Sequence, residues 1–141
     1  NPSLPHPTVA TASFDGTVRL WNVETGSCLH ILARHSKSVY SISFTGDGQF
    51  LASGSVDKNV YVWNTSNGNL LYQYTCKGGI YDLNWNPHTN LLVVCTTKSS
   101  AYMLDVPIQL TSSNHKSLTD PPTANHDGND STATTTTPMS F

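Results

Sequence analysis

The sequence predicts an all-β protein assembled from repeated four-stranded sheets, and three observations support this prediction. First, residues 9–29 and 51–71 carry the same pattern at an offset of 42 residues, with Trp21 falling on Trp63. Second, short β-rich runs are separated by turn residues such as Asp-Gly and Asn-Gly. Third, no window has helical periodicity. A period near 40 with a small sheet as the repeating unit is typical of the blades of a β-propeller.

The strands follow from the runs between these turns. The Asp15-Gly16 pair is the strongest short hairpin signal in the chain. A third, weaker copy of the pattern starts at "GGIYDLNW", which matches "KSVYSISF" at an offset of 41 residues. The expected strands cover residues 9–13, 18–22, 28–32, 39–44, 50–55, 60–63, 70–74, 80–85, 91–96 and 101–105.

The four strands of a propeller blade are lettered a to d, from the central channel outward. Assigned in this way, the expected strands form an open arc of about two and a half blades. The first repeat lacks strand a, the second is complete, and the third has no convincing strand d. In many propellers the last blade receives strand d from the N-terminal side of the ring, which leaves no free edge. We therefore interpret residues 9–110 as the C-terminal part of a larger propeller, whose remainder would be a partner of this piece.

The two ends of the chain have a different composition. Residues 1–8 contain three prolines and are expected to form a loop. Residues 111–141 consist mainly of Ser, Thr, Asn, Asp and Pro. Such a segment buries too little apolar surface to offset the entropy lost on ordering. We therefore predict a disordered Ser/Thr/Asn-rich tail at 111–141.

The bulk composition narrows the function classes. The 141-residue chain has a formal net charge of −2 and a pI of about 6.3, which gives no reason to expect a nucleic-acid surface. Its three cysteines have no metal-ligand spacing and suit a reducing compartment. There is no signal peptide and no apolar run of membrane-spanning length. We expect an intracellular protein that binds no metal, cofactor, membrane or nucleic acid directly.

Two of the copies contain a Trp-Asn pair, Trp21-Asn22 and Trp63-Asn64. This pattern, repeated in register, resembles the WD-repeat (WD40) family, in which Asp usually follows the Trp. The resemblance implies a β-propeller fold and four side chains that join each blade by hydrogen bonds. In the second copy these four side chains are His35, Ser53, Asp57 and Trp63.

The other two copies keep this set only in part. In the first copy the matching residues are Thr11, Asp15 and Trp21, and the histidine would precede the chain. In the third copy the four positions hold Cys76, Val94, Lys98 and Leu104. The hydrogen-bond network is therefore expected in the first two repeats and absent from the third.

Two constellations could be taken for chemical sites. His35, Ser53 and Asp57 have the residue types of a catalytic triad. A Trp indole is not part of a catalytic triad, however, and a catalytic nucleophile is not expected to recur from one repeat to the next. We therefore favour a structural role for these residues and predict no enzymatic activity. Cys28, His30 and His35 lie close in sequence, but no second ligand pair follows, and a metal site is not expected.

The family resemblance also implies a surface for protein partners. WD-repeat propellers usually bind partners where their a strands begin and their b–c turns meet. Two tyrosines and a phenylalanine lie at such positions, and amphipathic aromatic side chains are frequent binding hot spots. The alternative is that the tyrosines only line the mouth of the channel. The predicted binding positions are Phe14, Ser38, Tyr40, Val56 and Tyr81.

A closer resemblance lies in "SFDGTVRLW", "SVYSISF" and "GGIY". These segments are similar to the last blades of the transducin beta-like proteins, which are WD-repeat subunits of the nuclear receptor corepressor complex. The resemblance implies a nuclear scaffold that joins corepressor and histone deacetylase subunits and helps to exchange them for coactivators. The alternative is another WD-repeat adaptor, such as a ubiquitin-ligase substrate receptor or a G-protein beta-like scaffold.

Overall fold

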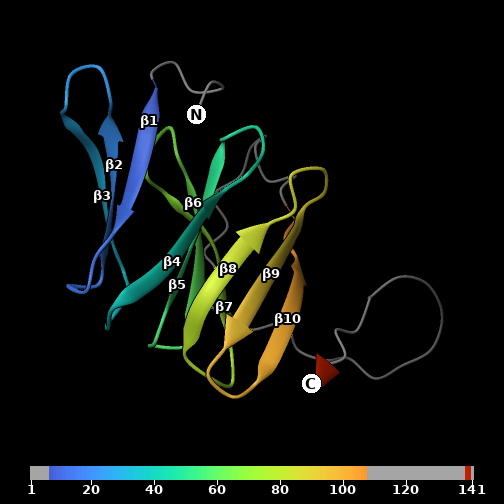
Figure 1. Ribbon diagram of the computed structural model, residues 1–141. Helices are drawn as coiled ribbons and strands as arrows, with labels where there is room; N and C mark the ends of the chain where they lie inside the picture. Colours follow the sequence, from blue (N-terminus) through green and yellow to red (C-terminus); the bar gives the residue numbers. More distant parts are fainter. Residues whose placement is uncertain (1–6, 108–138, 141) are drawn as a thin grey trace.

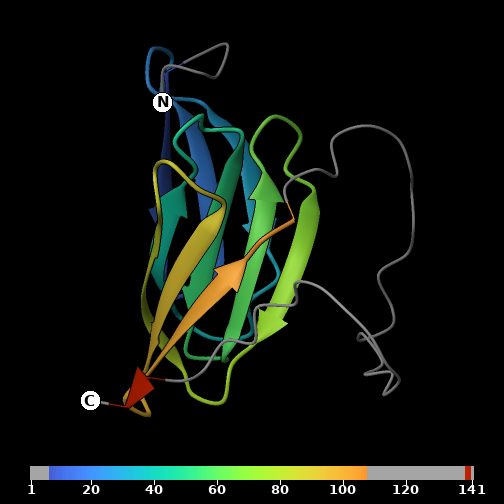
Figure 2. The same ribbon diagram turned by 90° about the vertical axis from the view of Figure 1, so that its right-hand side faces the viewer.

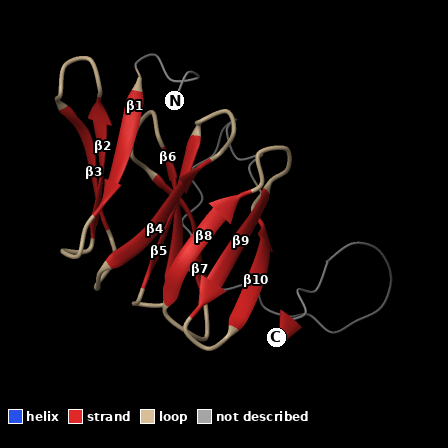
Figure 3. Cartoon of the chain, in the orientation of Figure 1, coloured by secondary structure: helices blue, strands red, loops and turns tan. Residues whose placement is uncertain are grey.

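The structure is a computed structural model that describes residues 7–107 and 139–140. This part of the chain consists of strands and turns (Figure 3), and it contains no helix that is long and apolar enough to cross a membrane. The strands are β1 (Thr8–Ala12), β2 (Thr17–Asn22), β3 (Cys28–Ala33), β4 (Val39–Phe44), β5 (Phe50–Ser55), β6 (Asn59–Asn64), β7 (Leu70–Thr75), β8 (Ile80–Trp85), β9 (Leu91–Thr96), β10 (Ser100–Asp105) and β11 (Met139–Ser140).

The strands form three antiparallel sheets that follow one another along the chain (Figure 1). Their orders are β1-β2-β3, β4-β5-β6-β7 and β8-β9-β10-β11. Neighbouring sheets pack face to face, with β8 against β4 and β5 and with β1 against β4 (Figure 2). All ten expected strands are present, and their observed ends differ from the expected ones by at most one residue. The all-β fold and the open arc of blades agree with the prediction.

The third sheet differs from the expected count in one respect. No fourth strand was expected in it, yet β11 lies beside β10, with Ser140 opposite Ser100 and Met139 opposite Ala101. An edge strand leaves a row of backbone N–H and C=O groups free, and any nearby segment can pair with it. Met139 and Ser140 are the only residues of the predicted tail that the structure describes. Residues 108–138 and 141 lie outside the described part of the chain. Of the predicted loop at 1–8, residues 1–6 also lie outside, and Thr8 already belongs to β1.

The middle sheet is covered on both faces, because side chains alternate along its strands. From β5 and β6, Leu51 and Trp63 point toward the first sheet and join one apolar cluster. Ala52 and Val62 point toward the third sheet and join the other cluster. All six residues of β5 are buried. The middle sheet is thus the part of the arc that is fixed from both sides.

The two outer sheets leave their far faces open. The first sheet exposes Val9, Leu29 and Ile31 on the side that faces away from the middle sheet. The third sheet exposes Val93 and Met103, which are paired across β9 and β10. In a propeller such faces are covered by the next blade, because each repeat buries its apolar surface against its neighbours. The open faces are therefore the structural consequence of an arc that does not close.

Two β-bulges interrupt the register at the start of strand a. In the pairing of β4 with β5, Val39 lies opposite Ser55 and Ser41 lies opposite Gly54, so Tyr40 has no partner position. The pairing of β8 with β9 skips Tyr81 in the same way. A bulge bends the strand and changes the direction in which its side chain points. Both tyrosines are therefore turned outward at equivalent places in successive repeats.

Candidate functional site

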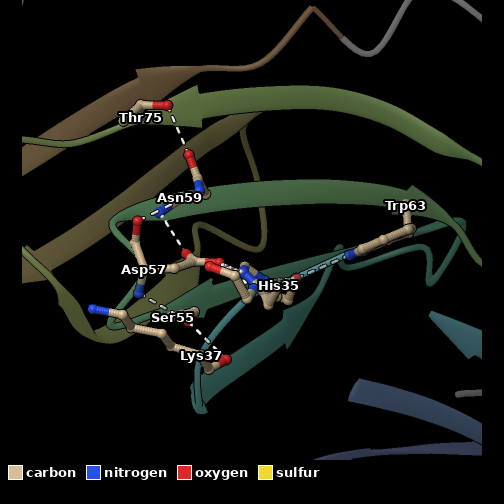
Figure 4. A network of polar contacts seen from close by, with 9 residues as sticks. His35, Lys37, Ser55, Asp57, Asn59, Trp63 and Thr75 are labelled. Carbon is tan, nitrogen blue, oxygen red and sulfur yellow. Dashed lines mark hydrogen bonds and ion pairs between the residues drawn. The ribbon is translucent and has the colours of Figure 1, made fainter. Parts of the chain in front are cut away.

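The polar network of the second repeat is a continuous chain of hydrogen bonds (Figure 4). The indole Nε1 of Trp63 donates to Ser53 Oγ at 2.9 Å. Ser53 Oγ lies 2.9 Å from His35 Nε2, and His35 Nδ1 lies 3.0 Å from Asp57 Oδ2. This chain of hydrogen bonds connects β6 (strand c) to β5 (strand b), to the loop before β4 (strand a) and to the turn between β5 and β6 (the b–c turn). It therefore ties the two inner strands of the blade to the loop that precedes the blade.

One protonation state satisfies every atom of this network. Ser53 Oγ already accepts the indole proton, so its own proton can be donated to His35 Nε2. The imidazole is then neutral and donates from Nδ1 to the carboxylate of Asp57. Burial lowers the pKa of His35 below its usual range, although the neighbouring Asp57 acts in the opposite direction. The neutral imidazole is the form that this site favours.

Asp57 gathers three donors at the b–c turn. Besides His35, the backbone N–H of Ser36 donates to Oδ2 at 2.9 Å, and the backbone N–H of Asn59 donates to Oδ1 at 2.9 Å. Burial by itself raises the pKa of Asp57, but these hydrogen bonds outweigh it, and the pKa is lowered. Asp57 is therefore a charged acceptor that holds the turn and the preceding loop together.

The first repeat contains the residues that match Ser53, Asp57 and Trp63 of this network, without the histidine that links them. Trp21 Nε1 donates to Thr11 Oγ1 at 2.9 Å, the same distance as in the second repeat, but on the open face of the sheet. Asp15 accepts from the backbone N–H and the hydroxyl of Thr17, at 2.8 and 2.7 Å. These hydrogen bonds to Thr17 lower the pKa of Asp15. In this repeat Asp15 organises its own turn.

The third repeat replaces the network by apolar packing. Cys76, Val94 and Leu104 are buried in the cluster between the second and third sheets. Burial raises the pKa of the Cys76 thiol to about 11, so the thiol stays protonated and packs as a small apolar group. Lys98, at the position that corresponds to Asp57, is exposed.

The buried network does not have the geometry of an active site. Ser53 is fully buried and its hydroxyl is occupied by Trp63 and His35, so a substrate has no access to it. Two of the three residues considered as metal ligands have other hydrogen-bond partners in the structure. His30 bonds through Nε2 to the carbonyl of Ser66 at 3.2 Å, while His35 belongs to the network. Among the described residues, no group of three His, Cys, Asp or Glu side chains could hold a metal ion.

The exposed site lies at the end of the sheets where strand a begins. Three aromatic rings from three successive sheets form a row, which we call the aromatic row: Phe14, Tyr40 and Tyr81. The ring centroids of Phe14 and Tyr40 are 5.6 Å apart, and those of Tyr40 and Tyr81 are 5.4 Å apart in an edge-to-face arrangement. The rings are 76%, 48% and 55% exposed, respectively. Such a large exposed aromatic surface is available for contact with a partner.

The loops around the aromatic row are joined to one another. The hydroxyl of Ser38 donates to the carbonyl of Phe14 at 3.2 Å, and the backbone N–H of Val56 donates to the carbonyl of Ser38 at 3.3 Å. The backbone N–H of Thr97 donates to the carbonyl of Gly79 at 2.9 Å. All five predicted binding positions thus lie at one end of the arc, the lower end in Figure 1. We call this surface the aromatic end; it is formed by loops 13–16, 34–38, 56–58, 76–79 and 97–99 and by the first residues of β4 (39–41) and β8 (80–82).

Sequence reasoning missed the bulges that orient the tyrosines and the polar contacts of Ser41 and Ser43 with the next blade. The hydroxyl of Ser41 donates to Asp82 Oδ1 at 2.9 Å, next to the aromatic row. A signal for the bulge was present in "IYDLNW", where the buried residues are Ile80, Leu83 and Trp85. Strict alternation would bury every second residue, so two adjacent exposed residues indicate an extra residue in the strand.

Comparison with known proteins identifies the repeats. The family model described as "WD domain, G-beta repeat" matches residues 2–22 and 26–64. The chain is 46% identical over 98 residues to the human F-box-like/WD repeat-containing protein TBL1Y, covering 70% of this chain and 19% of that protein. It is 40% identical over 98 residues to the WD40 repeat-containing protein HOS15 of Arabidopsis thaliana, covering 70% of this chain and 16% of that protein. The chain therefore spans about a fifth or less of the length of these relatives.

A solved structure supports the fold. The crystal structure of the β-propeller domain of Cps50 (Swd1) from Myceliophteria thermophila superposes with a TM-score of 0.65 at 23% identity, covering 71% of this chain and 32% of that one. The chain has two matched repeats, a blade network with the expected side chains and sheets arranged as in a propeller. It belongs to the WD-repeat (WD40) family of β-propeller proteins.

Proposed function

We propose that this chain is part of a protein-interaction scaffold whose partners dock on the aromatic end. The observation that supports this most directly is the aromatic row, in which three exposed rings from three successive sheets touch one another. Aromatic side chains dominate binding hot spots because they bury a large area at a small cost in conformational entropy. The bulges at Tyr40 and Tyr81 hold two of these rings outward in rigid strands.

We propose further that the scaffold is a subunit of a transcriptional corepressor complex that contains a histone deacetylase and acts in the nucleus. The support is the resemblance to the transducin beta-like proteins, together with 46% identity to TBL1Y over 98 residues. By this resemblance the partners are corepressor and histone deacetylase subunits, and the scaffold takes part in the exchange of corepressors for coactivators.

A second candidate is a ubiquitin-ligase substrate receptor. Its support is the printed name of the relatives, which combines "F-box-like" with WD repeats. Both candidates use the same aromatic end for binding and differ in the proteins that they bring together. A G-protein beta-like signalling scaffold is a further WD-repeat alternative.

The test is a pull-down of corepressor and histone deacetylase subunits with the full chain and with Tyr40→Ala and Tyr81→Ala variants. Each substitution should weaken binding by about thirtyfold, the equivalent of a hot spot of about 2 kcal/mol. The matched control is Val23→Ala, because Val23 is an apolar residue with 59% exposure at the opposite end of the sheets.

A thermal melt of each variant separates a loss of binding from a loss of folding. Wild-type binding by both tyrosine variants would place the docking surface elsewhere on the molecule. Retention of ubiquitin-ligase subunits without corepressor subunits would favour the second candidate.

A further inference from the structure

The positive charges of the described chain gather at the aromatic end. Among residues 7–107 and 139–140, five of the six lysine and arginine residues lie in its loops, and all five are exposed. None of them lies within ion-pair distance of a carboxylate, since the only such contact in this part of the chain joins Asp57 to the neutral imidazole of His35. The five residues are Arg34, Lys37, Lys58, Lys77 and Lys98.

The opposite end of the sheets has the opposite charge. Its turns and strand ends carry Glu24, Asp47 and Asp105, and the described residues there include no lysine or arginine. At the aromatic end the carboxylates are Asp15, Asp57 and Asp82, fewer than the five cations, and each is hydrogen-bonded within the protein. The surplus charge at the aromatic end is therefore positive, although the whole chain has a net charge of −2.

One of these lysines occupies a position that is unfavourable for its backbone. Lys58 has a φ of 75°, and the equivalent residue of the first repeat is Gly16 with a φ of 84°. The left-handed backbone conformation is unfavourable for residues with a Cβ and is normally adopted by glycine. The second repeat thus carries a cation in the turn beside Val56 at a conformational cost.

The charges and the aromatic row belong to one surface. The carbonyl of Lys58 accepts the backbone N–H of Cys76 at 2.8 Å, which joins the second b–c turn to the loop that carries Lys77. The hydroxyl of Ser55 donates to the carbonyl of Lys37 at 3.1 Å, which joins the same turn to the loop before Tyr40. These contacts hold the loops that carry Lys37, Lys58 and Lys77 next to one another.

We propose that the partner segment recognised at the aromatic end is an acidic polypeptide, with an apolar or aromatic residue on the aromatic row and Asp or Glu side chains facing the surrounding cations. This inference rests on the proposed function and specifies the chemistry of the partner. Complementary charge guides association and selects partners, while the buried apolar contact supplies most of the affinity. A nucleic acid fits less well, because it requires a strongly basic surface and this chain is acidic overall.

The experiment measures fluorescence anisotropy of three labelled peptides with the full chain. In the first peptide Asp and Glu surround a single Phe; in the second they are replaced by Asn and Gln; in the third they are replaced by Lys. The acidic peptide should bind most tightly, and its affinity should fall as the salt concentration rises, because salt screens exposed charges. Lys37→Gln, Lys58→Gln and Lys98→Gln should each weaken this binding about two- to fivefold, as expected for an exposed charge pair.

Two controls keep this proposal separate from the proposed function. Arg19→Gln removes the one described cation that lies outside the loops of the aromatic end, and it should leave the affinity unchanged. Tyr40→Ala should weaken all peptides alike, because it removes the shared apolar contact. Tighter binding of the Lys peptide, or equal binding of all three peptides, would overturn the acidic partner and leave the docking surface in place. Equally tight, Tyr40-dependent binding of a single-stranded RNA oligonucleotide would also overturn it.

Discussion

Replacement of Asp57 by alanine tests whether the buried network or only the apolar packing holds the middle blade. In the native structure Asp57 accepts hydrogen bonds from His35 Nδ1, Ser36 N and Asn59 N at 3.0, 2.9 and 2.9 Å. The substitution removes all three acceptors at once. The His35 ring is then left buried with a donor that has no partner.

The expected loss of stability follows from the number of donors that water cannot reach. Asn59 is partly exposed and Ser36 is exposed, so water can replace the lost acceptor at both. His35 is only 8% exposed, and its unsatisfied N–H should cost about 1–3 kcal/mol. We therefore expect Asp57→Ala to lower the free energy of unfolding by about 1–3 kcal/mol. Asp57→Asn retains one acceptor oxygen and should cost less.

The measurement is urea denaturation of the full chain at a fixed protein concentration. The matched control is Lys98→Ala, because Lys98 takes the place of Asp57 in the third repeat and is exposed. A surface substitution of this kind should change stability by no more than about 0.5 kcal/mol. An unchanged midpoint for Asp57→Ala would show that Asp57 only shapes its own turn, and equal losses for both variants would refute the network argument.

Three further perturbations test the buried histidine, the left-handed turn and the open faces of the outer sheets. Stability should fall as the pH drops from about 7 to about 5, because the pKa of His35 is lowered in the folded protein and the unfolded chain therefore binds the proton more readily. In denaturant melts, His35→Gln should reduce this dependence of stability on pH. Lys58→Gly should raise the free energy of unfolding by about 0.5–1 kcal/mol, because relief of the left-handed backbone outweighs the extra entropy of glycine, and a lower midpoint would contradict this. The 141-residue chain should self-associate through the open faces of its outer sheets in size-exclusion chromatography, and Ile31→Glu with Met103→Glu should reduce this association. A monomeric wild-type peak with a sharp unfolding transition would count against the interpretation of the chain as part of a larger propeller.

The repeat pattern was sufficient to predict the strands, because turn residues and alternation recur at a fixed period. Residues such as Asp15-Gly16 fix where a hairpin turns, and the strand ends follow within one residue. The partners in the blade network followed from the resemblance to the WD-repeat family. In the β5–β6 pair Ser53 lies opposite Tyr61 and Trp63 lies opposite Leu51, so Ser53 and Trp63 are diagonal neighbours on one face of the sheet. The structure holds them 2.9 Å apart.

The parts that could not be predicted depend on local departures from the regular pattern. The outward direction of Tyr40 and Tyr81 comes from bulges, which shift the register by one residue and which strict alternation does not include. The contact of their rings depends on how two blades pack, at a centroid distance of 5.4 Å. The pairing of β11 with β10 joins residues far apart in sequence, and no turn or periodicity connects them.

The third repeat shows how a position can lose its structural role and so become available for the binding role that we propose. In the second repeat the carboxylate of Asp57 is required because His35 is buried beside it and needs an acceptor. In the third repeat the histidine and serine positions hold Cys76 and Val94, which pack in an apolar cluster and need no acceptor. Replacing a buried polar network by well-packed apolar groups is often neutral for stability. The turn position is then free of any structural requirement, and it holds the exposed Lys98, which adds a cation to the aromatic end.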